Sequence, residues 1–96
     1  MWMNRMDVED AVDRYKNHAV LGIAARFLSD FVEEVDSVSD GWPYWKLPSN
    51  AAKKLMELIQ KGGNPTMNDL KKSLVPIKSF MTTHGSKVGM KMPPLY

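Results

Sequence analysis

Apolar side chains recur every three or four residues through the first part of the chain, from Asp7 to Asp36. This spacing places them on one face of an α-helix. A straight helix of this length would measure about 45 Å, which exceeds the width of a domain of this size. We therefore predict a long N-terminal helical segment with a bend or break at Gly22, whose missing side chain alternatively permits close contact with another helix. The apolar row consists of Val8, Val12, Tyr15, Ala19, Ile23, Phe27, Phe31 and Val35.

A second helix is predicted from Asn50 to Lys61. Ser49 suits the N-cap position, because its hydroxyl can accept a hydrogen bond from a backbone N–H of the first turn. Gly62 and Gly63 are expected to end the helix, since glycine readily adopts the conformation that follows a helix C-terminus. The apolar positions expected to face inward are Ala52, Leu55, Leu58 and Ile59.

A third helical segment follows Asn64 and Pro65. Thr66 and Asp69 have the spacing of a capping box, with aspartate in place of the preferred glutamate. Apolar residues then continue in helical phase through Pro76, which predicts either one kinked helix or two short helices that meet at this proline. Gly85 is expected to close the segment.

Three stretches lack helical periodicity: an N-terminal arm at 1–6, an aromatic loop at 37–48, and a tail at 86–96. We expect the tail to be either disordered or laid along a surface. Residues 1–96 are too few for two independent cores. The sequence therefore predicts one all-α domain, a small helical bundle of three to five helices with a long N-terminal helical segment.

The composition is ordinary for a globular protein, with 44% hydrophobic and 25% charged residues. The chain has no cysteine, which excludes disulfides and thiolate metal sites. Its most apolar stretch, from Ala19 to Leu28, is about half as long as a membrane-spanning helix requires and contains Arg26. We accordingly expect a soluble, cytoplasmic protein that does not enter a membrane.

Charge is distributed unevenly along the sequence. Residues 1–48 carry five basic and nine acidic side chains, a net charge of −4, whereas residues 49–96 carry eight lysines and two acidic side chains, a net charge of +6. Such asymmetry can indicate a charged partner. The two halves can equally compensate each other in the folded molecule.

The aromatic loop contains Trp42, Tyr44 and Trp45 within four positions. Rings of this kind can close the open end of a helical bundle. They can also anchor a protein interface or stack against a ligand or base. All three interpretations are open, and the three residues are candidates for a protein interface.

An acidic cluster containing Asp30, Glu33 and Glu34 lies toward the C-terminal end of the first helical segment. The helix dipole disfavours negative charge there, by a few tenths of a kcal/mol for each exposed carboxylate. Either the lysines of the second half compensate this charge or a basic partner does. The cluster is therefore a second candidate interface, with the internal explanation slightly favoured.

The sequence carries none of the usual signatures of catalysis or metal binding. It has no nucleophile motif such as GxSxG or SxxK and no glycine-rich phosphate loop. His18 is expected in the middle of the first helical segment and His84 at the end of the third, with no zinc-binding spacing between them. We predict a protein that is not an enzyme and that binds no metal or cofactor.

Residues 65–85 also permit a helix-turn-helix interpretation, in which Pro76 starts a recognition helix after a turn around Val75. The absence of arginine after Arg26 weighs against it, because arginine is the commonest reader of bases. The residues proposed for contact with nucleic acid are Lys71, Lys72, Lys78, Thr82 and Lys87.

Methionine is enriched at both ends of the chain, with Met1, Met3 and Met6 at one end and Met81, Met90 and Met92 at the other. Flexible thioether side chains suit adaptable protein contacts. Alternatively, the two ends pack together and complete the core.

The favoured hypothesis is a non-enzymatic protein-binding module, a small inhibitor or adaptor such as phages and mobile elements encode. Nucleic-acid binding is the alternative, and a homo-oligomeric structural protein is a third class.

Overall fold

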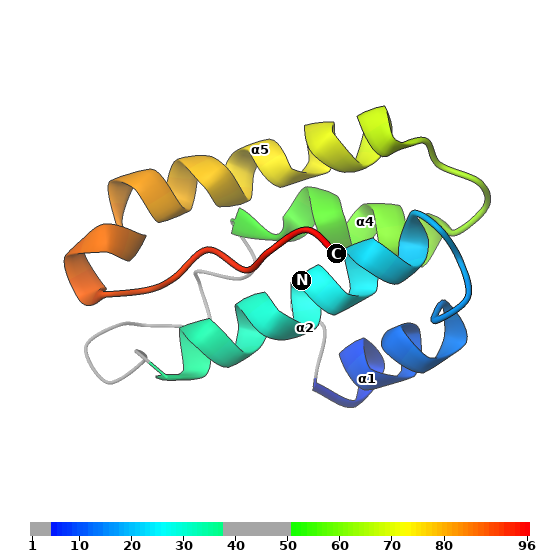
Figure 1. The fold of residues 1–96 in the computed structure, drawn as a ribbon, viewed down its shortest axis with the longest axis horizontal. Helices are drawn as coiled ribbons and strands as arrows, with labels where there is room; N and C mark the ends of the chain where they lie inside the picture. Colours follow the sequence, from blue (N-terminus) through cyan, green and yellow to red (C-terminus); the bar gives the residue numbers. More distant parts are fainter. Residues whose placement is uncertain (1–4, 38–50) are drawn as a thin grey trace.

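The structure, a computed structural model, describes residues 5–37 and 51–96 (Figure 1). Within these ranges all regular secondary structure is helical, which confirms the predicted all-α class and small bundle. The aromatic loop residues Trp42, Tyr44 and Trp45 lie outside the described residues. The elements are α1 (Arg5–Arg14), α2 (Leu21–Ser37), α4 (Lys53–Lys61), α5 (Met67–Thr83) and the 3-10 helix η2 (Gly85–Val88).

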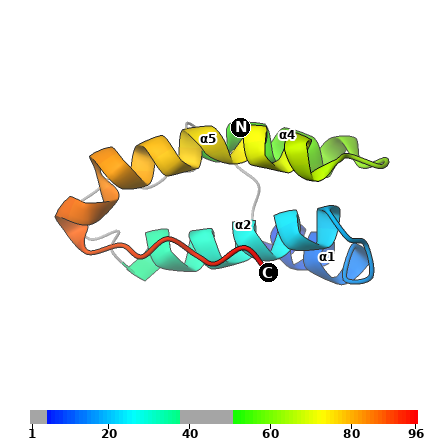
Figure 2. The same cartoon turned by 45° about the horizontal axis from the view of Figure 1, so that its top comes forward.

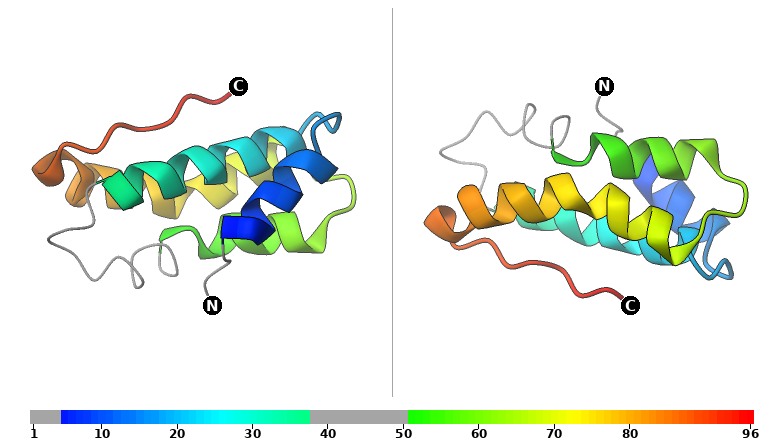
Figure 3. Two further views of the ribbon diagram at one scale, coloured as in Figure 1. Left: turned by 90° about the horizontal axis from the view of Figure 1, so that it is seen from below. Right: turned by 90° about the horizontal axis from the view of Figure 1, so that it is seen from above.

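Helix α2 is the centre of this arrangement. It contacts both α1 and α4, and α4 in turn contacts α5. An edge-on contact between the rings of Phe31 and Phe80, with centroids 6.1 Å apart, connects α2 to α5. Figures 1 and 3 show α1 folded back against α2, and α4 and α5 lying side by side in opposite directions.

The core is formed where the apolar faces of these helices meet. Of the predicted apolar row on the first segment, Val8, Phe27, Phe31 and Val35 are buried, whereas Ala19 is exposed and Val12, Tyr15 and Ile23 are half-buried. The remaining helices contribute buried residues in the predicted phase, and Met56 joins them. The largest fully buried side chains are Phe27, Phe31, Leu21, Leu28, Leu55, Leu70, Leu74, Ile77 and Val35.

The predicted break in the first helical segment is present, but it precedes Gly22. Helix α1 ends at Arg14 and α2 begins at Leu21, so the chain reverses between them. His18 lies in this turn, and its expected position in the middle of a helix was wrong. Its Nδ1 accepts hydrogen bonds from the backbone N–H groups of Val20 and Leu21, at 3.2 and 3.1 Å.

The second nitrogen of His18 connects the turn to a distant loop. Its Nε2 lies 3.2 Å from the carbonyl oxygen of Gly63. Because Nδ1 accepts two hydrogen bonds, the ring proton of the neutral imidazole is assigned to Nε2, which donates to Gly63. One imidazole thus caps α2 and ties the α1–α2 turn to the loop after α4.

Gly22 is required by the tightness of the same turn. A Cβ atom at this position would lie 2.6 Å from the carbonyl oxygen of Tyr15, closer than van der Waals contact permits. The glycine therefore allows the backbone of α2 to approach the end of α1. This close approach is the alternative role that the sequence allows for Gly22.

Helix α4 begins later than predicted. Its first residue is Lys53, and its N-cap residue, Ala52, makes no side-chain capping hydrogen bond. The predicted first residue, Asn50, and the predicted N-cap, Ser49, both lie outside the described residues. Ala52 itself is fully buried. The end of the helix is as predicted, with positive φ angles at the two glycines that follow Lys61.

Helix α5 starts with the predicted capping box. The hydroxyl of Thr66 accepts the N–H of Asp69 at 3.2 Å, and the Asp69 carboxylate accepts the N–H of Thr66 at 2.9 Å. The helix then runs without interruption through Pro76 to Thr83. The turn that a helix-turn-helix requires around Val75 is therefore absent, and that prediction was wrong. None of the described helices is long and apolar enough to cross a membrane.

Substitution of Gly22 by alanine tests the close approach of the α1–α2 turn. Replacing glycine by alanine in an open helix stabilises a protein by about 0.5–1 kcal/mol. Here the new methyl group would overlap the Tyr15 carbonyl, so we expect Gly22→Ala to lower the free energy of unfolding by about 1–3 kcal/mol. Urea denaturation measures this change, and a stabilised variant would contradict the described turn.

The capping box predicts a contribution of Asp69 to the pH dependence of stability. Hydrogen bonds from Thr66, the backbone bond first, lower the pKa of Asp69 below its ordinary value of 3.8. A lowered pKa means that the ionised carboxylate stabilises the fold above that value and loses this effect as the pH falls below it. Between about pH 5 and about pH 3, we therefore expect the wild type to lose more stability than Asp69→Asn. Urea curves with equal losses would contradict this prediction.

Candidate protein-binding groove

The C-terminal tail, residues 90–96, returns along α2 in the opposite direction (Figure 2). Gly89, in the left-handed conformation with φ 76°, ends η2 and turns the chain back. The N–H of Met90 then donates to the carbonyl oxygen of Gly85 at 2.9 Å. Met90 is 8% exposed and Pro93 is also buried. The tail is therefore laid along a surface, one of the two outcomes that the sequence allowed.

Two side chains of α2 hold the tail at opposite ends. The carboxylate of Glu34 accepts the backbone N–H of Lys91 at 3.3 Å. Further along, the guanidinium carbon of Arg26 lies 5.6 Å from the centroid of the Tyr96 ring, a cation–π contact. Lys91 lies beside Glu34, and Tyr96 lies beside Arg26. Residue numbers therefore rise along the tail where they fall along α2, so the tail runs antiparallel to this helix.

The docked tail, α5 and η2 border an open groove of about 430 Å³, which we call the methionine groove. Its apolar surface comes from thioether side chains, which are flexible and adapt to the shape of a contact. Met81 and Met90 are nearly buried, whereas Met92 is 39% exposed. The hydroxyl of Thr82 donates to the carbonyl oxygen of Lys78 at 2.9 Å. The lining residues are Lys78, Met81, Thr82, Ser86, Met90 and Met92.

A lysine-bearing face of α5 continues from this groove. Lys71, Val75, Lys78 and Thr82 are spaced by three or four residues, so they lie along one side of the helix. All four are exposed, Val75 by 60%. Lys78 and Thr82 belong both to this face and to the methionine groove.

The lysine candidates do not all gather at this place. Lys71, Lys78 and Thr82 share the exposed face of α5, and Lys87 follows on η2. Lys72 instead lines a hollow between α4 and α5 together with Lys61 and Asp69. The structure therefore assigns Lys72 to a separate surface of mixed charge.

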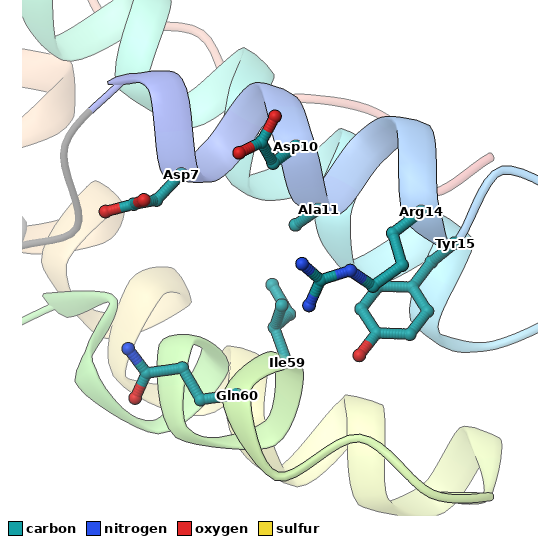
Figure 4. A pocket seen from close by; sticks show the side chains of 7 residues that line it. All are labelled: Asp7, Asp10, Ala11, Arg14, Tyr15, Ile59 and Gln60. Carbon is teal, nitrogen blue, oxygen red and sulfur yellow. The ribbon is translucent and has the colours of Figure 1, made fainter.

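A second cleft, of about 320 Å³, lies between α1 and α4 (Figure 4). Figure 4 shows Arg14 extending into the space above Ile59, with Gln60 on the opposite wall. Asp7 and Asp10 line the same cleft. Because carboxylates and a guanidinium share a small exposed site, the cleft favours neither an anion nor a cation, and this distinguishes it from the methionine groove.

The acidic candidates on α2 have different roles. Glu33 is exposed, whereas Asp30 and Glu34 are half-buried. Burial, followed by repulsion from Glu33, raises the pKa of Asp30, and Arg26 opposes the shift. Glu34 holds the tail through the backbone of Lys91.

The expected compensation of these carboxylates by lysine side chains is not found. Within residues 5–37 and 51–96, no ion pair joins Asp30, Glu33 or Glu34 to a lysine of the second half. At Glu34 the tail instead presents the backbone N–H of Lys91 to the carboxylate. The same described ranges contain no group of three or more histidine, aspartate and glutamate side chains that could hold a metal ion.

The chain matches no known protein-family model, no curated protein and no solved structure. The candidate site therefore depends on geometry and chemistry alone. The sequence indicates the methionines near the C-terminus as candidates for a contact surface, but it does not place them against α5. Nor does it indicate Arg26 and Glu34 as contacts of the tail, because neither the cation–π pair nor the single hydrogen bond has a local sequence signal.

Removing the Glu34 carboxylate should loosen the tail. We expect Glu34→Ala to increase the hydrogen-exchange rate of the Lys91 amide by about tenfold, since a hydrogen bond to a charged group contributes about 1.5 kcal/mol. Glu33→Ala is the matched control, because Glu33 is exposed one position earlier and makes no hydrogen bond to the tail. Equal exchange rates in the two variants would contradict the docking contact.

Proposed function

We propose that this protein is a non-enzymatic protein-binding module that holds its partner in the methionine groove. It would act as a small inhibitor or adaptor of the kind that phages and mobile elements encode. The observation that carries the proposal is the groove itself, where three methionines form an adaptable apolar floor beside exposed polar side chains. Such a surface suits a protein segment.

The groove is less suited to a small molecule or to catalysis. Small-molecule sites enclose most of the ligand and place several polar groups to orient it. Here the floor consists of flexible thioethers, and the Thr82 hydroxyl already donates to the backbone. The groove contains no pair of a nucleophile and a base within reach of each other.

Nucleic-acid binding is the alternative function. It is supported by the common exposed face of Lys71, Lys78 and Thr82, followed by Lys87 on η2. Contacts of lysine with phosphates would make the affinity fall steeply with salt. The apolar centre of the surface favours a protein partner, because Val75 and Met92 offer nothing to a phosphate backbone.

A pair of methionine variants tests the proposed function. Met92 in the groove and Met67 at the start of α5 are similarly exposed, at 39% and 41%. We expect Met92→Glu to reduce capture of the partner by the immobilised full chain at least about tenfold, as for a central interface residue. Met67→Glu should leave capture unchanged. The measurement is quantitative mass spectrometry of proteins retained from nuclease-treated lysate of the native host.

Two results would contradict the proposal. One is equal capture of the same partner by the wild type and by Met92→Glu. The other is retention of nucleic acid from untreated lysate, with every captured protein lost on nuclease treatment, which would support the alternative function. Circular dichroism spectra of both variants would establish that the helices are intact.

A further inference from the structure

We infer that the occupant of the methionine groove is an acidic amphipathic segment of a partner protein, with apolar side chains on the methionines and carboxylates beside the lysines. This inference rests on the proposed function and specifies the chemistry of the partner. Its basis is the combination of an apolar floor with charge of one sign around it.

The charge of this part of the molecule is entirely positive. From Leu70 to Tyr96 the chain contains five lysines and no aspartate or glutamate. The last acidic residue is Asp69, which is held in the capping box at the far end of α5. The lining of the groove likewise includes Lys78 and no carboxylate.

These lysines are not used inside the molecule. In the part of the chain that the structure describes, Lys71, Lys78 and Lys87 form no ion pair, and all three are exposed. The carboxylate of Glu34 on α2 accepts a backbone N–H of the tail. The ammonium groups therefore create a positive field that a partner of opposite charge would reduce.

The apolar and charged groups alternate along one continuous surface. Lys71, Val75, Lys78 and Thr82 follow each other along α5, and the last two reach the groove that contains Met92. A segment lying along this surface would need apolar side chains opposite Val75 and the methionines, and carboxylates opposite the lysines. An amphipathic segment with acidic residues beside its apolar face has this pattern.

The apolar and charged parts would contribute in different ways. Exposed ion pairs add little affinity because water and salt screen them, whereas they accelerate association and select partners. Burial of Met92 and Val75 would supply most of the affinity. Binding should therefore depend strongly on Met92 and moderately on Lys78, with salt acting mainly on the association rate.

The experiment is a selection of random 16-residue peptides displayed on phage against the intact 96-residue protein. Enriched peptides are synthesised, and their dissociation constants are measured by fluorescence anisotropy. We expect an excess of aspartate and glutamate, with apolar residues at helical spacing. Met92→Glu should weaken binding by at least about tenfold and Lys78→Glu by about fivefold.

Lys53→Glu is the control for the change in charge. It alters the net charge as much as Lys78→Glu does, but Lys53 is exposed on α4, which does not line the groove. We expect less than a twofold effect. A selected peptide whose acidic residues are replaced by lysine should bind the Lys78→Glu variant again. This result would show that Lys78→Glu weakens binding through the lost charge pair and not through misfolding.

The outcomes separate this inference from the proposed function. Neutral or basic peptides that lose binding with Met92→Glu would overturn the acidic partner and leave the groove as the interface. Peptides unaffected by Met92→Glu would overturn both. Light scattering that shows a dimer, dissociated by Met92→Glu, would replace the acidic partner by a second copy of this chain. Salt-sensitive binding of labelled 20-nucleotide DNA or RNA, lost in Lys78→Glu, would replace it by nucleic acid.

Discussion

Burial of the apolar face of α2 is the constraint on which the other elements depend. Phe27 and Phe31 are fully buried, and the helices packed around them come from every described part of the chain. Removal of a buried phenylalanine side chain costs about 3–5 kcal/mol, a large share of the total stability of a small domain. Helices α1 and α4 both pack against α2, and the Phe31–Phe80 contact brings α5 to it.

The polar side of the same helix positions the candidate site. Arg26 and Glu34 lie one and three turns along α2, and each holds one end of the tail. The tail in turn brings Met90 and Met92 beside Met81 of α5. A groove made from the C-terminal part of the chain is thus supported by helix α2 from the N-terminal part. The excess of lysine in the second half of the sequence places positive charge around this groove.

Features that depend on neighbouring residues could be predicted from the sequence. The capping box of Thr66 and Asp69 and the glycine stop after Lys61 involve residues within one turn, and both are present. The helical phases were also recoverable, because the spacing of apolar residues alone determines which face is buried. In each of these cases the types of the neighbouring residues were sufficient to predict the observed structure.

Features that depend on distant residues could not be predicted. The position of the break, before Gly22 and not at it, involves His18, whose second partner, Gly63, is 45 positions away. The docking of the tail depends on Glu34 and Lys91, which are 57 positions apart. At Pro76 the sequence allowed one kinked helix or two short helices, and α5 is one helix, with Leu74 and Ile77 buried on either side of the proline. Local sequence carries no signal for any of these contacts.

The most direct test of this account is a methyl NMR measurement on the isolated protein with ¹³C-labelled methionine methyl groups. If the tail forms one wall of the groove, nuclear Overhauser effects will connect the methyl groups of Met90 and Met81. Further nuclear Overhauser effects will connect the ring protons of Tyr96 to the side chain of Arg26. Sharp signals at random-coil positions for Met90 and Met92, without these effects, would show that the tail is free and that the methionine groove does not exist.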